Sequence, residues 1–486
     1  MAADLQDFTR KIQVIMRQDA GINGDAQRIE QLGWILFLKV YDMREDDWKL
    51  DGFTSIIPEK FRWKNWAADT GKGTRTGQEL LDFVNNELLP ALKDLEVTPQ
   101  TPRKKRIVKE VFSDVNQYMK DGTLLRKVLK EVDAVEFNTY EDIHAFGEIY
   151  ESILRDLQSA GNAGEFYTPR ALTDFMVGRV KPKLGERAAD FAAGTCGFLV
   201  SVLKTLRDTN NIDEWDKYGR SVYGVEKKPI PYLLGITNLL LHEVDRPDLI
   251  HSNSLARNVY DYSEADKFDM ILMNPPYGGT ETDNIKNNFP VDMRSDETAD
   301  LFLVLAMYRL KERGRAAVIM PDGFLFGTNG PKLAIKKHLL ENFNLHTVVR
   351  LPAGVFSPYT SITTNILFFA NGSGTRETWF YRVPLLDGDR SYSKSRPFTI
   401  DSFGECEKWW DDRREVKDSK GFDVARRVTI EELAERGYGF DYCGYPSKAE
   451  ELPGANEAFR DMEREFEAVR MSMARIAGMM EGWRND

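Results

Sequence analysis

Residues 274–277, Asn-Pro-Pro-Tyr, carry the side chains of this sequence that are best suited to chemistry. The apolar residues 270–273 before them predict a short buried strand, which the two prolines must end because proline has no N–H group. The Asn274 oxygen and the Pro275 carbonyl could accept both hydrogens of a planar –NH2 group, with the Tyr277 ring stacked behind its plane. Two such acceptors would help to free the amine lone pair for attack on an electrophilic carbon. A plain strand-ending turn is an equally good interpretation of these four residues taken by themselves.

The sequence around this turn predicts alternating strands and helices. Seven segments have the pattern of short strands, at residues 187–192, 221–225, 249–251, 270–273, 315–320, 346–351 and 365–370. Helix-length segments lie among them, at residues 193–206, 230–241 and 300–311. Strands joined through helices imply a doubly wound, mostly parallel sheet, so the fold class is α/β.

Small and acidic residues fall where these predicted strands end. Asp190 and residues 192–197 would form the first strand-to-helix turn, where small side chains let a nucleoside or amino-acid tail approach the backbone. Glu226 ends the second strand and could hold two vicinal ribose hydroxyls. Ligands of parallel sheets bind at the carboxyl ends of the strands, and Asn274 lies at such an end as well. The turn has neither the G-x-G-x-x-G fingerprint of dinucleotide folds nor a P-loop.

The chain before the sheet has a helical pattern. Apolar residues recur at three- and four-residue steps between residues 5 and 15, and residues 29–43 are apolar nearly all round, as in a central bundle helix. We therefore expect an all-α domain over residues 1–150 and the sheet domain over residues 151–445. For the basic run 103–106, a solvated helix start is favoured over a patch that contacts phosphates.

A second helix start is predicted immediately before the sheet domain's first strand. Thr168 would be the N-cap and Pro169 the first helical residue of a helix that continues through residues 171–180. The free N–H groups of such a helix start favour an anion.

Composition indicates a soluble globular protein of two or three units. The chain has 486 residues, of which 42% are hydrophobic and 29% charged, and its formal net charge is −11. DNA would therefore have to be bound through a local patch or a basic partner. We expect a cytoplasmic protein without a membrane span, a secretory signal or a metal site, whose three widely spaced cysteines are reduced thiols.

The sheet pattern fades after residue 371. Residues 371–375 predict a turn, as in a hairpin, and residues 409–412 and the capping box 429–432 predict short helical pieces. Residues 446–486 predict a C-terminal helix that binds a partner, with docking onto the chain's own body as the alternative. Its apolar seam follows three- and four-residue steps through Phe459, Met462, Phe466, Val469, Met473, Ile476 and Met480.

The order of the motifs GEFYTPR, DFAAGTCGFL, GVEKKP and NPPYGG resembles that of the S-adenosylmethionine-dependent amino-methyltransferases of DNA. The longer phrases FDMILMNPPYGG, GRAAVIMPDGFLF and VVRLPAGVFSPYTSITTNILFF, together with the helical N-terminal domain, resemble the modification subunit of type I restriction–modification systems. The resemblance covers about residues 1–445. It implies a Rossmann-like methyltransferase domain that transfers methyl from S-adenosylmethionine to N6 of adenine in DNA.

The resemblance also implies roles for individual residues. Asn274, Pro275, Pro276 and Tyr277 would act on an adenine flipped out of double-stranded DNA, with Tyr277 stacked on the base and no covalent intermediate. The residues implied in S-adenosylmethionine binding are Phe166, Tyr167, Thr168, Asp190, Ala192, Gly194, Thr195, Gly197, Glu226, Asn253 and Asn274. Phe356, Tyr359 and Thr364 lie in a segment that shapes the base pocket in the family. The implied partners are a specificity subunit that carries two modification subunits, and a restriction or translocase subunit.

The sequence departs from the family pattern at two positions. Cys196 stands where the family often has glycine, and Asn253 stands where it often has an acidic residue before Ser-Leu. Three other interpretations accompany the main one: a protein-glutamine N5-methyltransferase, an N4-cytosine methyltransferase, and a catalytically silent assembly module, which these two departures keep open. The large helical domain and the terminal apolar seam disfavour the first, and the intact Asn274–Tyr277 turn disfavours the last.

Overall fold

The computed structural model describes residues 2–50, 52–68, 74–135, 150, 167–209, 215–357, 360–385, 391–393, 395–445 and, near the C-terminus, 462, 464, 466, 467, 470, 471 and 473. The chain forms two compact units, Met1–Gly444 and Tyr445–Asp486.

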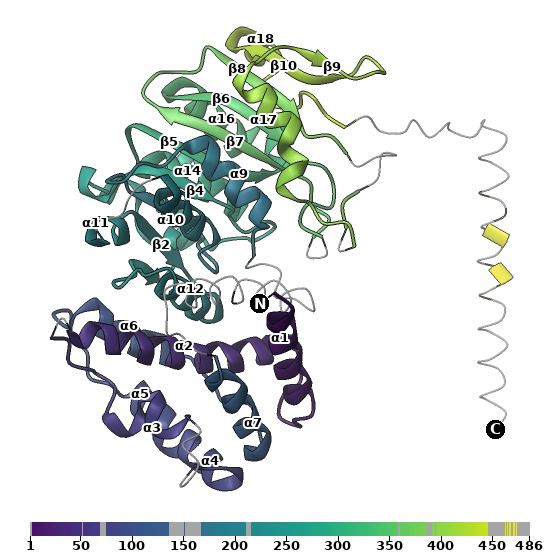
Figure 1. Ribbon diagram of the computed structural model, residues 1–486. Helices are drawn as coiled ribbons and strands as arrows, with labels where there is room; N and C mark the ends of the chain where they lie inside the picture. Colours follow the sequence, from purple (N-terminus) through teal and green to yellow (C-terminus); the bar gives the residue numbers. More distant parts are fainter. Residues whose placement is uncertain are drawn as a thin grey trace. The chain divides into compact units, whose positions relative to one another are not determined.

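A ten-stranded sheet organises the first unit, in the order β3-β2-β1-β4-β5-β7-β6-β8-β10-β9 (Figure 1). The strands are β1 (Ala188–Asp190), β2 (Val222–Glu226), β3 (Leu249–His251), β4 (Phe268–Met273), β5 (Leu310–Pro321), β6 (Phe343–Arg350), β7 (Thr364–Asn371), β8 (Glu377–Arg382), β9 (Val416–Lys417) and β10 (Asp423–Thr429). Strands β3, β2, β1, β4 and β5 are parallel, and β7 is antiparallel to both of its neighbours. The predicted α/β class with a mostly parallel sheet is confirmed.

Helices cover both faces of this sheet (Figure 1). The helices after residue 166 are α9 (Arg170–Val180), α10 (Gly197–Thr209), α11 (Trp215–Gly219), α12 (Pro229–Leu241), α13 (Asp283–Lys286), α14 (Thr298–Arg309), α15 (Asp322–Phe326), α16 (Gly330–Asn342), α17 (Gly404–Asp411) and α18 (Ile430–Glu435). In β4, Met270 and Leu272 belong to the core that contains α12, whereas Ile271 and Met273 belong to the core that contains α14. This alternation follows from the two-residue period of a strand, and it buries β4 on both faces.

The N-terminal part of the unit is helical, as predicted. Its helices are α1 (Ala2–Arg17), α2 (Asp25–Leu50), α3 (Trp63–Trp66), α4 (Gly77–Phe83), α5 (Leu89–Lys93), α6 (Arg103–Phe112) and α7 (Gly122–Asp133), with a π-helical turn at Val84–Leu88 between α4 and α5. Helix α2 is buried over most of its length and packs against α12, where a Cβ on Gly33 would lie only 3.1 Å from Leu233. Within the described ranges, the structure contains no helix that is long and apolar enough to span a membrane.

The basic run at the start of α6 is not a solvated helix start, so that prediction is wrong. The Arg103 side chain is 14% exposed, and it donates to the Pro247 carbonyl at 3.0 Å and to the Glu110 carboxylate at 2.7 and 2.6 Å. The Lys104 ammonium lies 4.3 Å from the centroid of the Trp48 ring. The run is partly buried because it faces the loop before β3, and sequence spacing does not reveal such a distant partner.

The chain after residue 371 also differs from the prediction. Residues 371–375 do not close a hairpin, because β8 pairs with β6 in parallel and β7 lies between β5 and β6. Strands β8, β9 and β10 extend the sheet where its pattern had faded. The two predicted helical pieces are confirmed as α17 and α18, and the Thr429 hydroxyl caps α18 by accepting from the Glu432 N–H.

The Arg103 contacts predict a stability effect. Arg103→Met should lower the free energy of unfolding by about 2 kcal/mol, because it removes charge-assisted hydrogen bonds to two backbone carbonyls and to Glu110, which keeps the Tyr232 hydroxyl as a partner. Urea unfolding followed by tryptophan fluorescence measures this loss. Lys105→Met is the matched control from the same run and should change stability by less than about 1 kcal/mol. Equal losses in the two variants would show that Arg103 does not join the helical part to the sheet.

Candidate active site

The carboxyl ends of β1, β2 and β4 meet at one edge of the sheet. In the parallel register Ala188 pairs with both Val222 and Met270, so the three strands run side by side in one direction. Asp190 and Glu226 end β1 and β2, and Asn274 follows β4. A cavity of about 510 Å³ opens at this edge. The lining includes every described residue that was predicted for the catalytic turn or for binding the methyl donor: Tyr167, Thr168, Asp190, Ala192, Gly194, Thr195, Gly197, Glu226, Asn253, Asn274, Pro275, Pro276 and Tyr277.

The other predicted residues are Phe166, at the donor site, and Phe356, Tyr359 and Thr364, in the segment expected to shape the base pocket. Phe166 and Tyr359 lie outside the described residues. Phe356 lines the cavity, whereas Thr364 is 2% exposed in β7 and is not part of the lining. From the same segment, Thr360 and Ile362 line the cavity instead.

Hydrogen bonds fix the orientation of the Asn274 amide. Its Nδ2 donates to the Thr168 hydroxyl at 3.1 Å, so its Oδ1 is the atom left for the Tyr277 hydroxyl, which donates to it. Burial raises the pKa of Tyr277 well above its ordinary value, which keeps this hydroxyl protonated and able to donate. The amide therefore presents an oriented acceptor at the end of β4.

The Thr168 contact overturns one prediction about α9. The N-cap of this helix is Pro169, whose carbonyl accepts from the Leu172 N–H at 2.9 Å, and the helix begins at Arg170. Thr168 lies one residue too early to be the N-cap, and its hydroxyl serves Asn274 instead. The Thr168 hydroxyl, just before α9, therefore accepts a hydrogen bond from Asn274 and does not cap the N–H groups of the helix.

The turn that contains Asn274 is anchored at both ends. Gly278 has φ +69°, a left-handed conformation that favours glycine, and the Gly279 carbonyl accepts from the Thr298 N–H at 3.0 Å at the start of α14. The Tyr277 ring meets the Phe356 ring edge-on, with centroids 6.3 Å apart and an interplanar angle of 79°. The Tyr277 ring thus packs against an aromatic residue of the cavity wall.

Two buried carboxyl groups hold the small-residue turn after β1. Asp190 accepts from the Ala192 N–H at 3.0 Å, and Glu226 accepts from the Gly194 N–H at 2.8 Å and the Lys228 N–H at 2.7 Å. Burial raises the pKa of Asp190 to about 8 and also raises the pKa of Glu226. Such a pair favours a ligand that donates hydrogen bonds or carries positive charge.

Of the two departures from the family pattern, Asn253 lines the cavity, whereas Cys196 lies in the turn but not in the lining. Cys196 is buried with φ +65°, so a residue with a side chain occupies the conformation that glycine adopts more readily. The Asn253 Oδ1 accepts from the Leu255 N–H at 3.0 Å, which leaves its NH2 group and one lone pair for a ligand. All three cysteines are free and buried.

Several lining residues were not predicted. Phe302 and Thr298 reach the cavity from α14, and Lys227, Ser252 and Ser254 reach it from the ends of β2 and β3. The residues that follow the strand ends could have been found by extending each motif by one or two positions. The α14 residues carry no such signal, because a helix pattern does not tell which side chain reaches a distant turn.

Family profiles match most of the chain. The N-6 DNA methylase family matches residues 141–452, and the HsdM N-terminal domain family matches residues 5–132. The chain belongs to the N-6 DNA methylase family. The methylase is similar to the type I restriction enzyme EcoEI methylase subunit of Escherichia coli, with 47% identity over 443 residues that cover 90% of this chain and 89% of that protein.

Solved structures agree with this membership. A modification subunit assigned to a type I restriction enzyme of Vibrio vulnificus YJ016 has a TM-score of 0.77 and 38% identity, covering 89% of this chain and 93% of that chain. A chain from a structural study of complex assembly in a type I restriction–modification system has a TM-score of 0.81 and 34% identity, covering 99% and 98%. The methylase is thus a type I modification subunit and an adenine-specific DNA methyltransferase, which sets aside the glutamine, cytosine and silent-module interpretations.

The expected stacking of the Tyr277 ring on the substrate base can be tested separately from the contribution of its hydroxyl. Tyr277→Phe should retain methyl transfer to DNA within about threefold, since the stacking surface remains and Thr168 still orients Asn274. Tyr277→Ala should lower the rate about ten- to a hundredfold, because base stacking is worth about 1–3 kcal/mol. Steady-state assays with tritiated methyl donor measure both rates. A phenylalanine variant as slow as the alanine variant would contradict a stacking role.

Proposed function

We propose that the cavity holds S-adenosylmethionine between Asp190 and Glu226 and, beside it, an adenine flipped out of double-stranded DNA against Asn274 and Tyr277. The observation that carries this proposal is the Asn274 amide, oriented by Thr168 at the end of β4 in the same cavity as the two buried carboxyl groups. Membership of a methylase family implies the methyl donor in general, whereas the assignment of residues to it is the proposal.

The residues present fit such a donor. A cavity of about 510 Å³ lies within the range usual for ligand sites. Glu226 would accept from the ribose hydroxyls, and the small residues from Ala192 to Gly197, with Tyr167 and Thr168 opposite, would line the methionine end. Asn253 would face the adenine ring of the donor. The sulfonium and the amino group are cations, and they would stabilise the ionised form of the two carboxyl groups, which burial alone disfavours.

The chain's contribution to chemistry is positioning. When bound, S-adenosylmethionine supplies an activated methyl carbon, and the S–C bond breaks as the N6 lone pair of adenine forms the N–C bond. Asn274 Oδ1 and the Pro275 carbonyl would accept the two N6 hydrogens, so the Tyr277 hydroxyl must release Oδ1 when the base enters. The proton lost from N6 passes to water. Orientation in line with the methyl group then accounts for catalysis without a covalent intermediate.

Loss of the oriented amide tests these roles. Asn274→Ala should lower methyl transfer at least about a hundredfold, because it removes one preorganised acceptor, and should leave the affinity for S-adenosylmethionine within about threefold. Radiolabel transfer and calorimetry on the same preparation give the two values. Asn258→Ala, which removes an amide that only caps a short 3-10 turn, is the matched control and should change neither. A large loss of donor affinity in Asn274→Ala would contradict the assigned role.

We further infer that a specificity subunit supplies target recognition and carries two copies of this chain, with a restriction or translocase subunit added to the complex. The net charge of −11 argues against DNA binding through the overall field of this chain. In the second unit, Met462, Phe466 and Met473 of the predicted apolar seam are exposed by 52%, 76% and 68%. The seam residues Phe459, Val469, Ile476 and Met480 lie outside the described residues. Exposed apolar side chains at helical spacing suit a partner helix.

Removal of this segment tests the partner assignment. Truncation after residue 450 should prevent co-purification with the specificity subunit and leave the unfolding temperature of the first unit unchanged. Replacing Met462, Phe466 and Met473 together by Ser should have the same effect, whereas Glu467→Ala, at an exposed charged position, should not. Co-purification of the truncated chain with the partner would contradict the docking role of the seam.

A further inference from the structure

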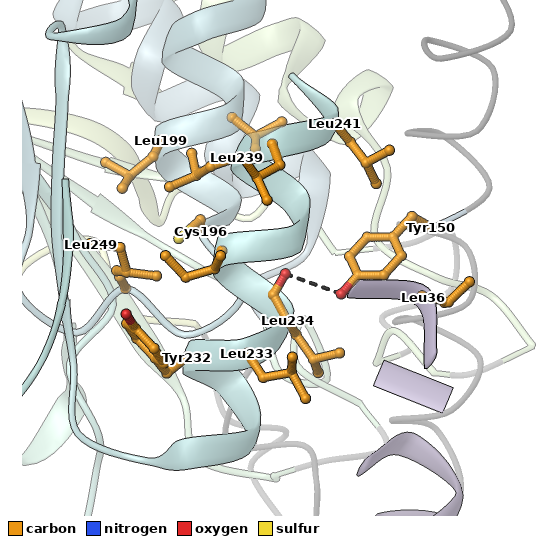
Figure 2. Packing of buried hydrophobic residues seen from close by; sticks show 14 of the residues in the cluster. Leu36, Tyr150, Cys196, Leu199, Tyr232, Leu233, Leu234, Leu239, Leu241 and Leu249 are labelled. Atoms are coloured by element: carbon orange, nitrogen blue, oxygen red, sulfur yellow. Dashed lines mark hydrogen bonds between the residues drawn. The ribbon is translucent and has the colours of Figure 1, made fainter. Parts of the chain in front are cut away.

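Helix α12 lies directly behind the turn that lines the proposed donor site. Residues 231–241 of this helix are all buried, between α2 on one side and the turn on the other. Figure 2 shows Cys196 of the turn beside α12 and, on the other side of the helix, the Tyr150 hydroxyl bonded to the Leu234 carbonyl. The helix therefore contacts the back of the turn without lining the cavity.

Asn238 of α12 holds the turn by a single hydrogen bond. Its side chain is fully buried, and its Nδ2 donates to the Thr195 carbonyl at 2.9 Å. Its Oδ1 has no hydrogen-bond partner among the residues that the structure describes. An unpaired buried acceptor is unfavourable, and a leucine of similar size would avoid it. Stability of the helix thus gives no reason for an amide here, whereas the Thr195 contact does.

Cys196, the residue after Thr195, has a strained backbone conformation that a hydrogen bond to the preceding carbonyl can help to hold. Cys196 has φ +65°, a conformation that costs a residue with a side chain about 1–2 kcal/mol. The α12 residue that faces it is Gly235, where a Cβ would lie 2.8 Å from Cys196 Sγ and 3.1 Å from the Gly194 carbonyl. Asn238 thus fixes the carbonyl before Cys196, and the missing side chain at Gly235 makes room for its sulfur. A strained conformation persists only where the surroundings determine it from several directions.

We propose that Asn238 is a positioning residue for methyl-donor binding, which acts from behind the cavity by holding the Thr195–Cys196 peptide, with Gly235 as the second contact. The inference rests on the proposed donor site. On this inference, α12 supports donor binding although none of its residues lines the cavity. Without the bond, the Thr195 carbonyl is free to turn, and the backbone between Gly194 and Gly197 loses the form that receives the donor.

The test compares donor affinity with fold stability in the full chain. Asn238→Leu should bind S-adenosylmethionine about tenfold more weakly in calorimetry, the usual worth of one buried hydrogen bond, while its unfolding temperature without ligand stays equal or rises. In methyl-transfer assays the KM for the donor should rise, and kcat at saturating donor should remain at the wild-type value. Thr237→Val is the matched control, since it removes a buried hydroxyl that donates to the Leu233 carbonyl within the same helix, and it should keep the wild-type affinity.

Each other outcome counts against the inference. Wild-type affinity in Asn238→Leu overturns it, and so does an affinity loss that Thr237→Val shares or that a lowered unfolding temperature accompanies. Gly235→Ala is a second variant, which adds one methyl group against Cys196 and should also weaken binding; unchanged affinity there overturns the Gly235 contact. Failure of the wild-type chain itself to bind S-adenosylmethionine would overturn the proposed donor site, and the inference with it.

Discussion

The end of β4 is the constraint on which the site depends. Pro275 and Pro276 cannot extend a ladder, so the chain must leave the sheet at Asn274, beside the end of β1. The hydrogen bonds from Asn274 to Thr168 and from Tyr277 to Asn274 then fix the amide within the turn. An amide that is already oriented has only to exchange the Tyr277 hydroxyl for the substrate amine, so the proposed role of this turn is to promote transfer by positioning, with no acid, base or nucleophile of its own.

The helical part of the chain supports the same site from the opposite direction. Arg103 of α6 contacts the Tyr232 hydroxyl of α12, and α2 packs along α12. Helix α12 in turn bonds the turn after β1, because Asn238 donates to the Thr195 carbonyl. The helical and methyltransferase sequences therefore meet in one compact unit. In physical terms, the position of α12 links the helical part, which touches no proposed ligand, to the turn that we propose receives the donor.

Sequence reasoning predicted the site better than its surroundings. Strand ends follow from the prolines after β4, from the small residues after Asp190 and from Glu226, and parallel strands bring such ends to one edge. The function of Thr168 was missed because its partner Asn274 is 106 residues away, and a local cap was the nearer explanation. Strands β9 and β10 were missed because β9 has only two residues and β10 carries charged residues at partly exposed positions. Asn238 gave no signal, since one amide in an apolar helix is unremarkable until its partner is known.

The most direct test of the account is the chemical identity of the methylated product. Radiolabelled S-adenosylmethionine is incubated with genomic DNA that lacks adenine methylation, with this chain alone and with its co-expressed specificity subunit, and the DNA is digested to nucleosides. The account predicts label in N6-methyladenine when the specificity subunit is present, and none with this chain alone. Label in N4-methylcytosine or in protein, or no transfer by the complex despite measurable donor binding, would contradict it.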